Sequence, residues 1–304
     1  MKTVESASRR TFVKTTAAGT AVAAVAPSAS AASSEKIDVW ILHGKDNRKL
    51  MEKAMEIVMA NGGLGTGVKN LTLKVNAAWG REPEVGANTH PDLVDVFLEK
   101  ARASGVETVK IPEHPCNSAK IAFDKSGIEK VAKKHKCKMI DLQKDQDSFR
   151  KVEISKGRKL KEAEVASEYL DADAVVNIPV AKHHGGATVS CAMKNWMGIV
   201  KDRRYWHRTD LHQCIADFSS FYQPAWTIVD ATRCMLDHGP QGPAENLAEP
   251  NLLIISRDQV AADACVMDIF GHQPRDIKYL RYAEEMGIGV IDKSKMNIQE
   301  IEVG

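Results

Sequence analysis

Apolar and polar residues alternate along the chain in two different ways. From residue 37 onward, short apolar runs alternate with longer stretches in which apolar residues recur at helical spacing. The run 37–42 predicts a strand, and residues 48–60 predict a helix that ends at Gly62 and Gly63. Further strands are predicted at 71–75, 108–111, 138–142, 174–179, 226–230 and 251–256, and further helices at 92–103, 128–135, 163–170, 211–221, 260–270 and 277–286.

Regular alternation of strands and helices is typical of an α/β fold. We therefore expect a mostly parallel central sheet with flanking helices. The chain of 304 residues contains no internal repeat, and the Gly/Pro-rich segment 239–250 is too short to be a domain linker. The sequence predicts a single elaborated domain over residues 35–304.

The first 31 residues follow a different pattern. Arg9 and Arg10, then Phe12, precede the apolar run 15–26, and small residues follow as far as Ala31. This order predicts a twin-arginine signal peptide over residues 1–31 that is cleaved after Ala31, the alternative being a disordered basic tail. The apolar run is too short to cross a bilayer, which takes about 20 residues.

A signal of this kind implies a partner and a compartment. We expect the twin-arginine translocase to export the folded chain, which places the processed protein in the periplasm. No later run approaches the roughly 18 apolar residues of a spanning helix, so we expect no membrane span after cleavage.

The charge of the chain argues against a nucleic-acid partner. Lys and Arg number 42 against 40 Asp and Glu, and residues 1–31 hold four of these cations and one anion, which leaves 38 cations and 39 anions. The stretch 125–161 is locally basic, with 13 Lys and Arg against 5 Asp and Glu. We interpret it as a solvated helix followed by a hairpin with arms at 149–154 and 158–160, and keep an anionic partner as the alternative.

The six cysteines lie 20 or more residues apart and form no C-x-x-C pair. A self-contained iron–sulfur cluster is therefore not predicted, nor is a zinc ribbon. The signatures of dinucleotide, P-loop and serine-hydrolase sites are also missing from the sequence.

Polar residues follow the predicted strands. Because ligands bind beyond the carboxyl ends of parallel strands, this pattern predicts a site at one edge of the sheet. The residues concerned are His43, Lys74 and Asn76, then Glu113, His114 and Cys116, then Lys182, His183 and His184, then Asp230, and finally Arg257 and Asp258.

The densest group lies in the segments 182–188, 194–198 and 201–207. Its glycines allow close backbone approach, and its cations, among them Lys182, Lys194, Arg203 and Arg204, suit a small anionic ligand. The alternative is that these residues bond locally or are surface charges.

Two adjacent imidazoles in this group raise the question of catalysis. We expect His184 to act as a general base or metal ligand, Asp230 to orient it or to be a second ligand, and Lys74, Lys182 and Lys194 to stabilise charge. A divalent or redox metal would draw on His184, His207 and Asp230, which come from distant segments, since no H-E-x-x-H spacing occurs.

Many of these residues recur in an order that resembles a known family, domain of unknown function 362. The matching residues are Lys74-Val75-Asn76, Asn88-Thr89-His90-Pro91, the run 173–179 with Lys182 and His184, Lys194-Asn195, Trp206-His207, Asp230, Gly239-Pro240 and Asp258 to Ala264. The family pattern usually has Lys and Thr where this chain has Val180 and His183.

The resemblance implies a shared polar site without an agreed substrate. Many members of the family carry a fused ferredoxin-like module, whose cysteine run this chain lacks. The implied site residues are Lys74, Asn76, His90, Lys182, His184, Lys194, Asn195, His207, Asp230 and Asp263. At Asp263 a structural role, as an anion at the start of the 260–270 helix, is the alternative.

These observations lead to one main hypothesis and two alternatives. The main hypothesis is an exported enzyme acting on a small anionic substrate, with metal assistance or redox chemistry left open. The first alternative is a periplasmic anion-binding or redox-accessory protein without catalysis, and the second is a purely structural role.

Overall fold

A mostly parallel sheet of eight strands runs through the part of the chain that the computed structural model describes, residues 37–240 and 242–304. These residues belong to one compact unit. The expected signal peptide, with Arg9, Arg10 and Phe12, lies outside the described residues. In spatial order the strands are β14 (Met296–Glu302), β1 (Ile37–His43), β13 (Leu252–Ser256), β10 (Trp226–Ala231), β7 (Ala174–Ile178), β2 (Asn70–Val75), β3 (Thr108–Glu113) and β4 (Lys138–Asp141).

The expected α/β class with a mostly parallel sheet is confirmed. β13 is antiparallel to both of its neighbours, and the other five pairings are parallel. Every residue of β7 and β10 is buried, which is why these strands read as nearly continuous apolar runs.

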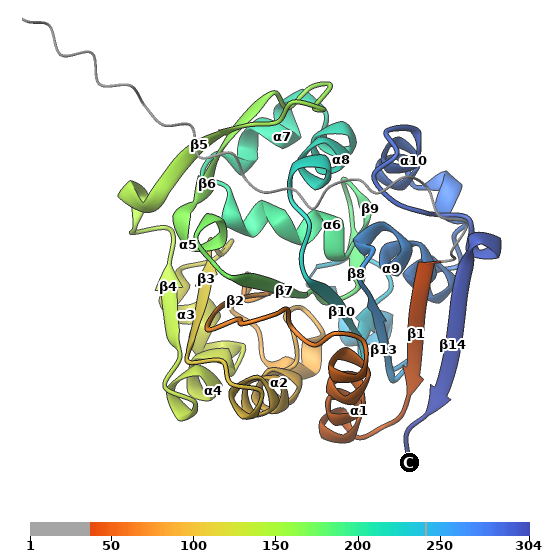
Figure 1. Ribbon diagram of the computed structural model, residues 1–304. Coiled ribbons are helices and arrows are strands. Elements are labelled where there is room, and N and C mark those ends of the chain that lie inside the picture. The colour runs from red at the N-terminus through yellow and green to blue at the C-terminus, as the bar shows by residue number, and fades with distance from the viewer. Residues whose placement is uncertain (1–36, 241) are drawn as a thin grey trace, which may run out of the picture. The chain divides into compact units, whose positions relative to one another are not determined.

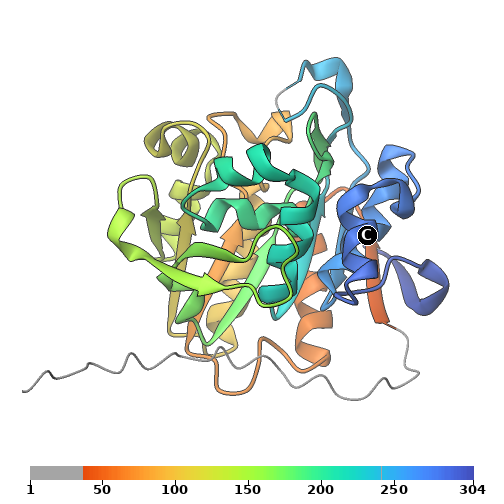
Figure 2. The ribbon, with the colours of Figure 1, turned by 90° about the horizontal axis from the view of Figure 1, so that it is seen from above.

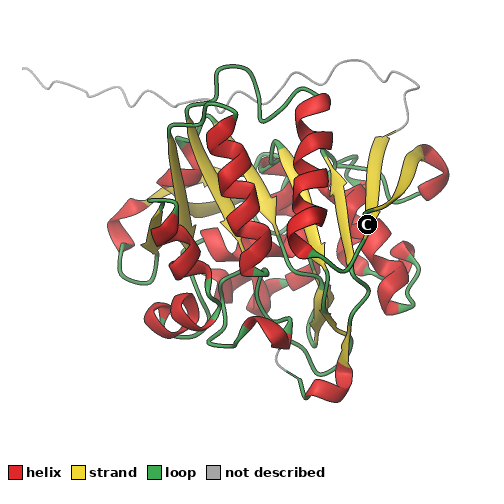
Figure 3. Ribbon diagram, turned by 90° about the horizontal axis from the view of Figure 1, so that it is seen from below, coloured by secondary structure: helices red, strands yellow, loops and turns green. Residues whose placement is uncertain are grey.

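Helices cover both faces of the sheet (Figure 1). On one face lie α1 (Asn47–Ala60), α2 (Pro91–Ala103), α3 (Ala119–Lys125) and α4 (Ile128–Lys134), and Figure 3 looks onto this layer. On the other face lie α5 (Ser167–Leu170), α6 (Ala192–Asn195), α7 (Arg203–Thr209), α8 (Leu211–Phe221), α9 (Gln259–Val266) and α10 (Lys278–Glu285), and Figure 2 looks onto that layer. Each layer buries its own hydrophobic core against the sheet.

Three small two-stranded sheets extend this framework. They are β5–β6 (Phe149–Glu153, Glu162–Ala166), β8–β9 (Lys182–His184, Thr188–Ser190) and β11–β12 (Cys234–Met235, Leu247–Ala248). The predicted helix at 163–170 was wrong for its first half, because residues 162–166 pair with β5 instead. The second arm of the hairpin therefore starts later than the predicted 158–160.

All 13 Lys and Arg side chains of the basic stretch 125–161 are exposed, as expected of a solvated face. All six cysteines are unpaired in the structure. Among the described residues, no helix is both long and apolar enough to cross a bilayer.

Candidate functional site

A cavity of about 220 Å³ opens at the carboxyl edge of the parallel strands, next to the ends of β2, β3 and β7. Eleven of the residues expected from the sequence line it, and they include every chargeable side chain in its described wall: Asn76, Glu113, His114, Cys116, Lys182, His184, Lys194, Asn195, Arg203, Arg204 and His207. The structure therefore brings together side chains from segments up to 131 residues apart in sequence, from Asn76 to His207.

Lys74 does not line this cavity but lies beneath its floor, where all three N–H donors of its ammonium group have partners. It donates to Glu113 Oε2 at 2.8 Å, to Asn195 Oδ1 at 3.2 Å and to the Val75 carbonyl. A lysine has three N–H donors, so none is left for a ligand. Burial lowers the pKa of Lys74, and the charge of Glu113 opposes that shift. Lys74 therefore supports the floor and does not supply the free charge that the sequence led us to expect.

Asn195 joins the floor to the wall. Its Oδ1 accepts from Lys74 and from Asn76 Nδ2 at 3.1 Å, and its Nδ2 donates to Asn177 Oδ1 at 2.8 Å. Asn177 was missed from the sequence, although a single amide inside the buried run of β7 is an unusual residue there. These amides fix the positions of the lysines around them.

Lys182 is 2% exposed and is held at two points. Its Nζ donates to Asn76 Oδ1 at 3.1 Å and to the Ala87 carbonyl, which leaves one N–H without a partner in the described chain. Burial is the main reason why its pKa falls to about 7, and the neighbouring charge of Lys194 lowers it further. Lys182 is therefore close to the balance between ammonium and amine at neutral pH.

Lys194 differs from both of these lysines. It is 9% exposed and lines the cavity, yet its ammonium has no hydrogen bond or ion pair within the described residues. Burial lowers its pKa to about 8, and the nearby Arg203 guanidinium acts in the same direction. Burying a charge without a partner costs free energy, and a bound ligand of opposite charge would offset that cost. An unpartnered buried lysine in a cavity wall is therefore typical of a ligand-binding residue.

His184 is neutral and has a defined tautomer. Its Nδ1 accepts from the backbone N–H of Gly186 and of Ala187, both at 3.1 Å, so the ring proton sits on Nε2. Burial, with help from the charge of Lys194, lowers its pKa to about 3. His184 is thus suited to donate a hydrogen bond through Nε2, which differs from the general base expected from the sequence.

His207 and the two arginines form the outer wall. The rings of His184 and His207 stack with centroids 6.1 Å apart and planes 23° apart. Arg203 donates to the carbonyls of His114 and Pro115 at 2.7 Å each and so fixes the loop after β3. Arg204 is exposed and has no hydrogen bond or ion pair to the described chain.

Asp230 and His90 do not line the cavity. Asp230 Oδ2 accepts from the His90 backbone N–H at 2.8 Å, and its Oδ1 accepts from the N–H and hydroxyl of Thr232. The His90 ring in turn caps α2 by accepting from the Asp92 N–H at 3.3 Å. Asp230 therefore ties the loop before α2 to the central sheet and does not orient His184.

The expected metal ligands are not gathered. His184 and His207 are neighbours, but Asp230 lies elsewhere with both oxygens occupied. Among the described residues, no group of three or more His, Cys, Asp or Glu side chains is arranged to hold a metal ion.

Two further expectations change because of the fold. Since β13 is antiparallel, Arg257 and Asp258 follow it at the opposite edge of the sheet, where Arg257 stacks on Trp226 at 4.2 Å. Asp263 lies inside α9, and its carboxylate accepts from the N–H groups of Ala192 and Met193 at 2.7 and 3.1 Å. It therefore anchors α6, the helix that carries Lys194 and Asn195, and does not cap its own helix.

The cavity is positively charged overall. Among the described residues that line it, Glu113 is the only carboxylate, and the buried Lys74 neutralises it. Lys182, Lys194, Arg203 and Arg204 have no carboxylate in contact among the described residues. Such an arrangement favours an anion.

The sheet and this cavity define an α/β protein with a cationic crevice at the carboxyl edge of its parallel strands. Residues 71–268 match the family model described as "Domain of unknown function (DUF362)", and the chain belongs to this family. The resemblance seen in the sequence is thereby confirmed.

Three proteins to which the chain is similar are distant from it in sequence. It is 24% identical over 244 residues to a thylakoid-associated protein of Synechocystis sp., a match that covers 75% of this chain and 72% of that protein. A structural-genomics protein from Thermotoga maritima has a TM-score of 0.48 at 11% identity, over 80% of this chain and 60% of its own. The lactate racemase apoprotein of Thermoanaerobacterium thermosaccharolyticum has a TM-score of 0.47 at 13% identity, over 81% and 59%. The chain thus spans about three fifths of these two solved structures.

Proposed function

We propose that the cavity binds a small anion, such as a phosphate or a short carboxylate, and that the protein is an enzyme acting on it. The observation that carries the proposal is the ammonium group of Lys194, which is nine-tenths buried against the cavity without a partner in the described chain. An anion would supply the missing counter-charge.

Several donors around Lys194 support the same ligand chemistry. Lys182 has one N–H left, the Nε2–H of His184 is free, and Arg204 stands unpaired at the exposed side of the cavity. Oxygens of a phosphate or carboxylate accept such hydrogen bonds, and charge-assisted bonds are the stronger kind.

The lysines also supply the capacity to move a proton. A group transfers protons best when its pKa is close to the working pH, and burial brings Lys182 to a pKa of about 7 and Lys194 to a pKa of about 8. In this proposal the lysines take the acid–base role that the sequence assigned to His184.

Binding without turnover is the second candidate, as a periplasmic anion-binding or accessory protein. It is favoured by the tautomer of His184, whose Nδ1 is occupied, and by the pairing of Glu113 with Lys74. If no bound phosphate ester or carboxylate is converted in a mass-spectrometric screen of the product mixture, this second candidate replaces the enzyme.

We further propose that the protein acts in the periplasm. The proposal rests on Arg9, Arg10 and Phe12 followed by an apolar run and small residues, an order that the twin-arginine translocase recognises.

The binding proposal is tested by thermal shift and calorimetry with inorganic phosphate and acetate. We expect phosphate to raise the melting temperature of the wild-type protein and Lys194→Met to weaken binding by about tenfold or more. The same variant should melt at or above the wild-type temperature without ligand, since it removes an unpaired buried charge.

The matched control is Lys201→Met, because Lys201 pairs with Glu164 outside the cavity. It should bind phosphate like the wild type. Equal phosphate affinity in wild type, Lys194→Met and Lys201→Met would contradict the proposed site.

A further inference from the structure

We infer that Lys194 is a nucleophile whose amine forms an imine with the carbonyl carbon of a small oxo acid held in the cavity. The inference rests on the proposed anion site and names its substrate class, a carboxylate that also carries an aldehyde or ketone. It starts from a comparison of the three buried lysines at this edge of the sheet.

Only one of these lysines has an amine that is free to react. The three donors of Lys74 are used and Glu113 contacts it at 2.8 Å. Lys182 is held by Asn76 and by the Ala87 carbonyl. Lys194 has no such contact within the described chain, so its Nζ can approach a ligand without breaking a hydrogen bond.

The surroundings of Lys194 favour the neutral amine that nucleophilic attack requires. No carboxylate contacts it among the described residues, the nearby Arg203 is cationic, and burial brings its pKa to about 8. A desolvated lysine next to other cations is a known way to activate an amine.

The cavity can hold the rest of the substrate. Its volume of about 220 Å³ is several times the roughly 30 Å³ that one water occupies in the liquid. Arg204 and the Nε2–H of His184 provide donors for a carboxylate placed beside the carbonyl group. The substrate carboxylate and the reacting carbon would therefore be held together.

The step balances without a further reactant. The lone pair of Lys194 Nζ attacks the carbonyl carbon and forms a C–N bond, while the C=O bond opens to a hydroxyl group. Loss of that hydroxyl as water, with a proton supplied by the ammonium of Lys182, leaves the C=N bond of the imine. Lys182 regains a proton from the nitrogen of the adduct, and nothing is oxidised or reduced.

The test is reductive trapping with glyoxylate and sodium borohydride on the full chain, followed by peptide mapping by mass spectrometry. We expect one reduced adduct that forms at Lys194 at least about tenfold faster than at Lys201, which is partly exposed and lies outside the cavity, because the cavity concentrates and orients glyoxylate. Inorganic phosphate should slow it by competition, and glycolate, which has neither an aldehyde nor a ketone group, should give no adduct. A reduced adduct at Lys182, which also lines the cavity, in place of Lys194 would overturn the inference.

The variant Lys194→Arg separates this inference from the proposed function. It keeps a positive charge, so phosphate should still bind, but a guanidinium does not form an imine and the trapped adduct should vanish. Phosphate binding to the wild type with no preference for Lys194 in trapping would overturn the inference and leave the anion site standing. If the wild type neither binds phosphate nor gives a trapped adduct, both the proposed anion site and the inferred imine are overturned.

Discussion

At the scale of single residues, the contacts of a side chain decide its role more than its type does. Lys74 and Lys194 are both buried lysines, yet the first is fully bonded and the second has no partner among the described residues. The two backbone N–H groups that bond to His184 Nδ1 fix its proton on Nε2. These local contacts leave Lys194 as a buried lysine without a partner in the described chain and make His184 a hydrogen-bond donor.

This scale gives a prediction on pH. The pKa of Lys182 is about 7 and that of Lys194 about 8 in the folded protein, both below the usual 10.5. The positive charge is therefore present below about pH 6 and is lost as the pH rises through these values. Sulfate keeps its charge over this range, so its affinity, measured by calorimetry, should fall about tenfold or more from pH 6 to pH 9.

Trapping of the imine should instead pass through an optimum at about pH 7 to 8, because it needs both the neutral amine of Lys194 and the ammonium of Lys182. The variant Lys194→Arg is the control for sulfate binding, since its charge persists above pH 8 and should flatten the upper part of the curve. A sulfate affinity that stays constant from pH 6 to pH 9 in the wild type would show that these lysines do not bind the anion.

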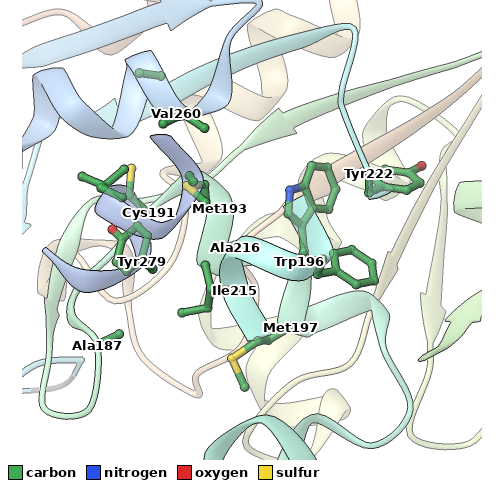
Figure 4. Packing of buried hydrophobic residues seen from close by; sticks show 14 of the residues in the cluster. Ala187, Cys191, Met193, Trp196, Met197, Ile215, Ala216, Tyr222, Val260 and Tyr279 are labelled. Atoms are coloured by element: carbon green, nitrogen blue, oxygen red, sulfur yellow. The ribbon is translucent and has the colours of Figure 1, made fainter. Parts of the chain in front are cut away.

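At the scale of elements, one short segment positions much of the site. It comprises α6 and the following 3₁₀ turn, η3 (Trp196–Ile199), and it carries Lys194 and Asn195. Asp263 accepts a hydrogen bond from the backbone N–H of Ala192 at the start of α6. Trp196 packs against Tyr222 with ring centroids 4.8 Å apart (Figure 4). The segment is thus fixed by the packed core on one side and presents its polar residues to the cavity on the other.

Gly198 in this segment gives a second prediction. A Cβ at this position would lie 2.0 Å from Glu113 Oε1 and 2.9 Å from Lys74 Nζ. Gly198→Ala should therefore lower the free energy of unfolding by about 1–3 kcal/mol in urea denaturation and weaken phosphate binding, because the floor of the cavity must shift.

Gly185→Ala is the matched control. Gly185 lies in the turn between β8 and β9, and a Cβ there would meet no atom within 4 Å. We expect this variant to change the unfolding free energy by less than about 0.5 kcal/mol. If Gly198→Ala were as stable as Gly185→Ala, the close packing of Gly198 against the Lys74–Glu113 pair would be refuted.

At the scale of the whole molecule, the direction of the strands determines which polar residues meet. The strands β2, β3 and β7 are parallel, so residues after each of them reach the same edge. The antiparallel β13 sends its following residues to the other edge. A functional site at the carboxyl edge is therefore a property of the complete sheet.

The proposed export signal also belongs to this scale and gives a third prediction. In a bacterium with a twin-arginine translocase, the double variant Arg9→Lys, Arg10→Lys should accumulate as an uncleaved precursor in the cytoplasm, because the translocase reads the arginine pair. Immunoblots of periplasmic and cytoplasmic fractions measure this. Lys14→Gln, which leaves the pair intact, should be exported like the wild type, and equal export of the double variant would argue against this route.

The sequence by itself determined the fold class and the approximate place of the site. The runs of β7 and β10 are mostly apolar, as is typical of strands buried on both faces of a sheet. The segments between the strands have apolar residues at helical spacing, and helices packed on a central sheet bury their apolar faces and those of the strands together. Because parallel strands end at one edge, the polar residues after β2, β3 and β7 could be expected to meet there, as Asn76, Cys116 and Lys182 do.

Only the tertiary structure decided what each of these residues does. Periodicity does not specify the direction of β13, which depends on its pairing with both β1 and β10 and which moves Arg257 and Asp258 away from the site. Periodicity does not specify hydrogen-bond partners either. Asp230 bonds to His90 and Thr232, and Lys74 bonds to Glu113. Lys194 is left without a partner in the described chain. Burial, partners and pKa arise from neighbours that are distant in sequence, and folding alone brings those neighbours together.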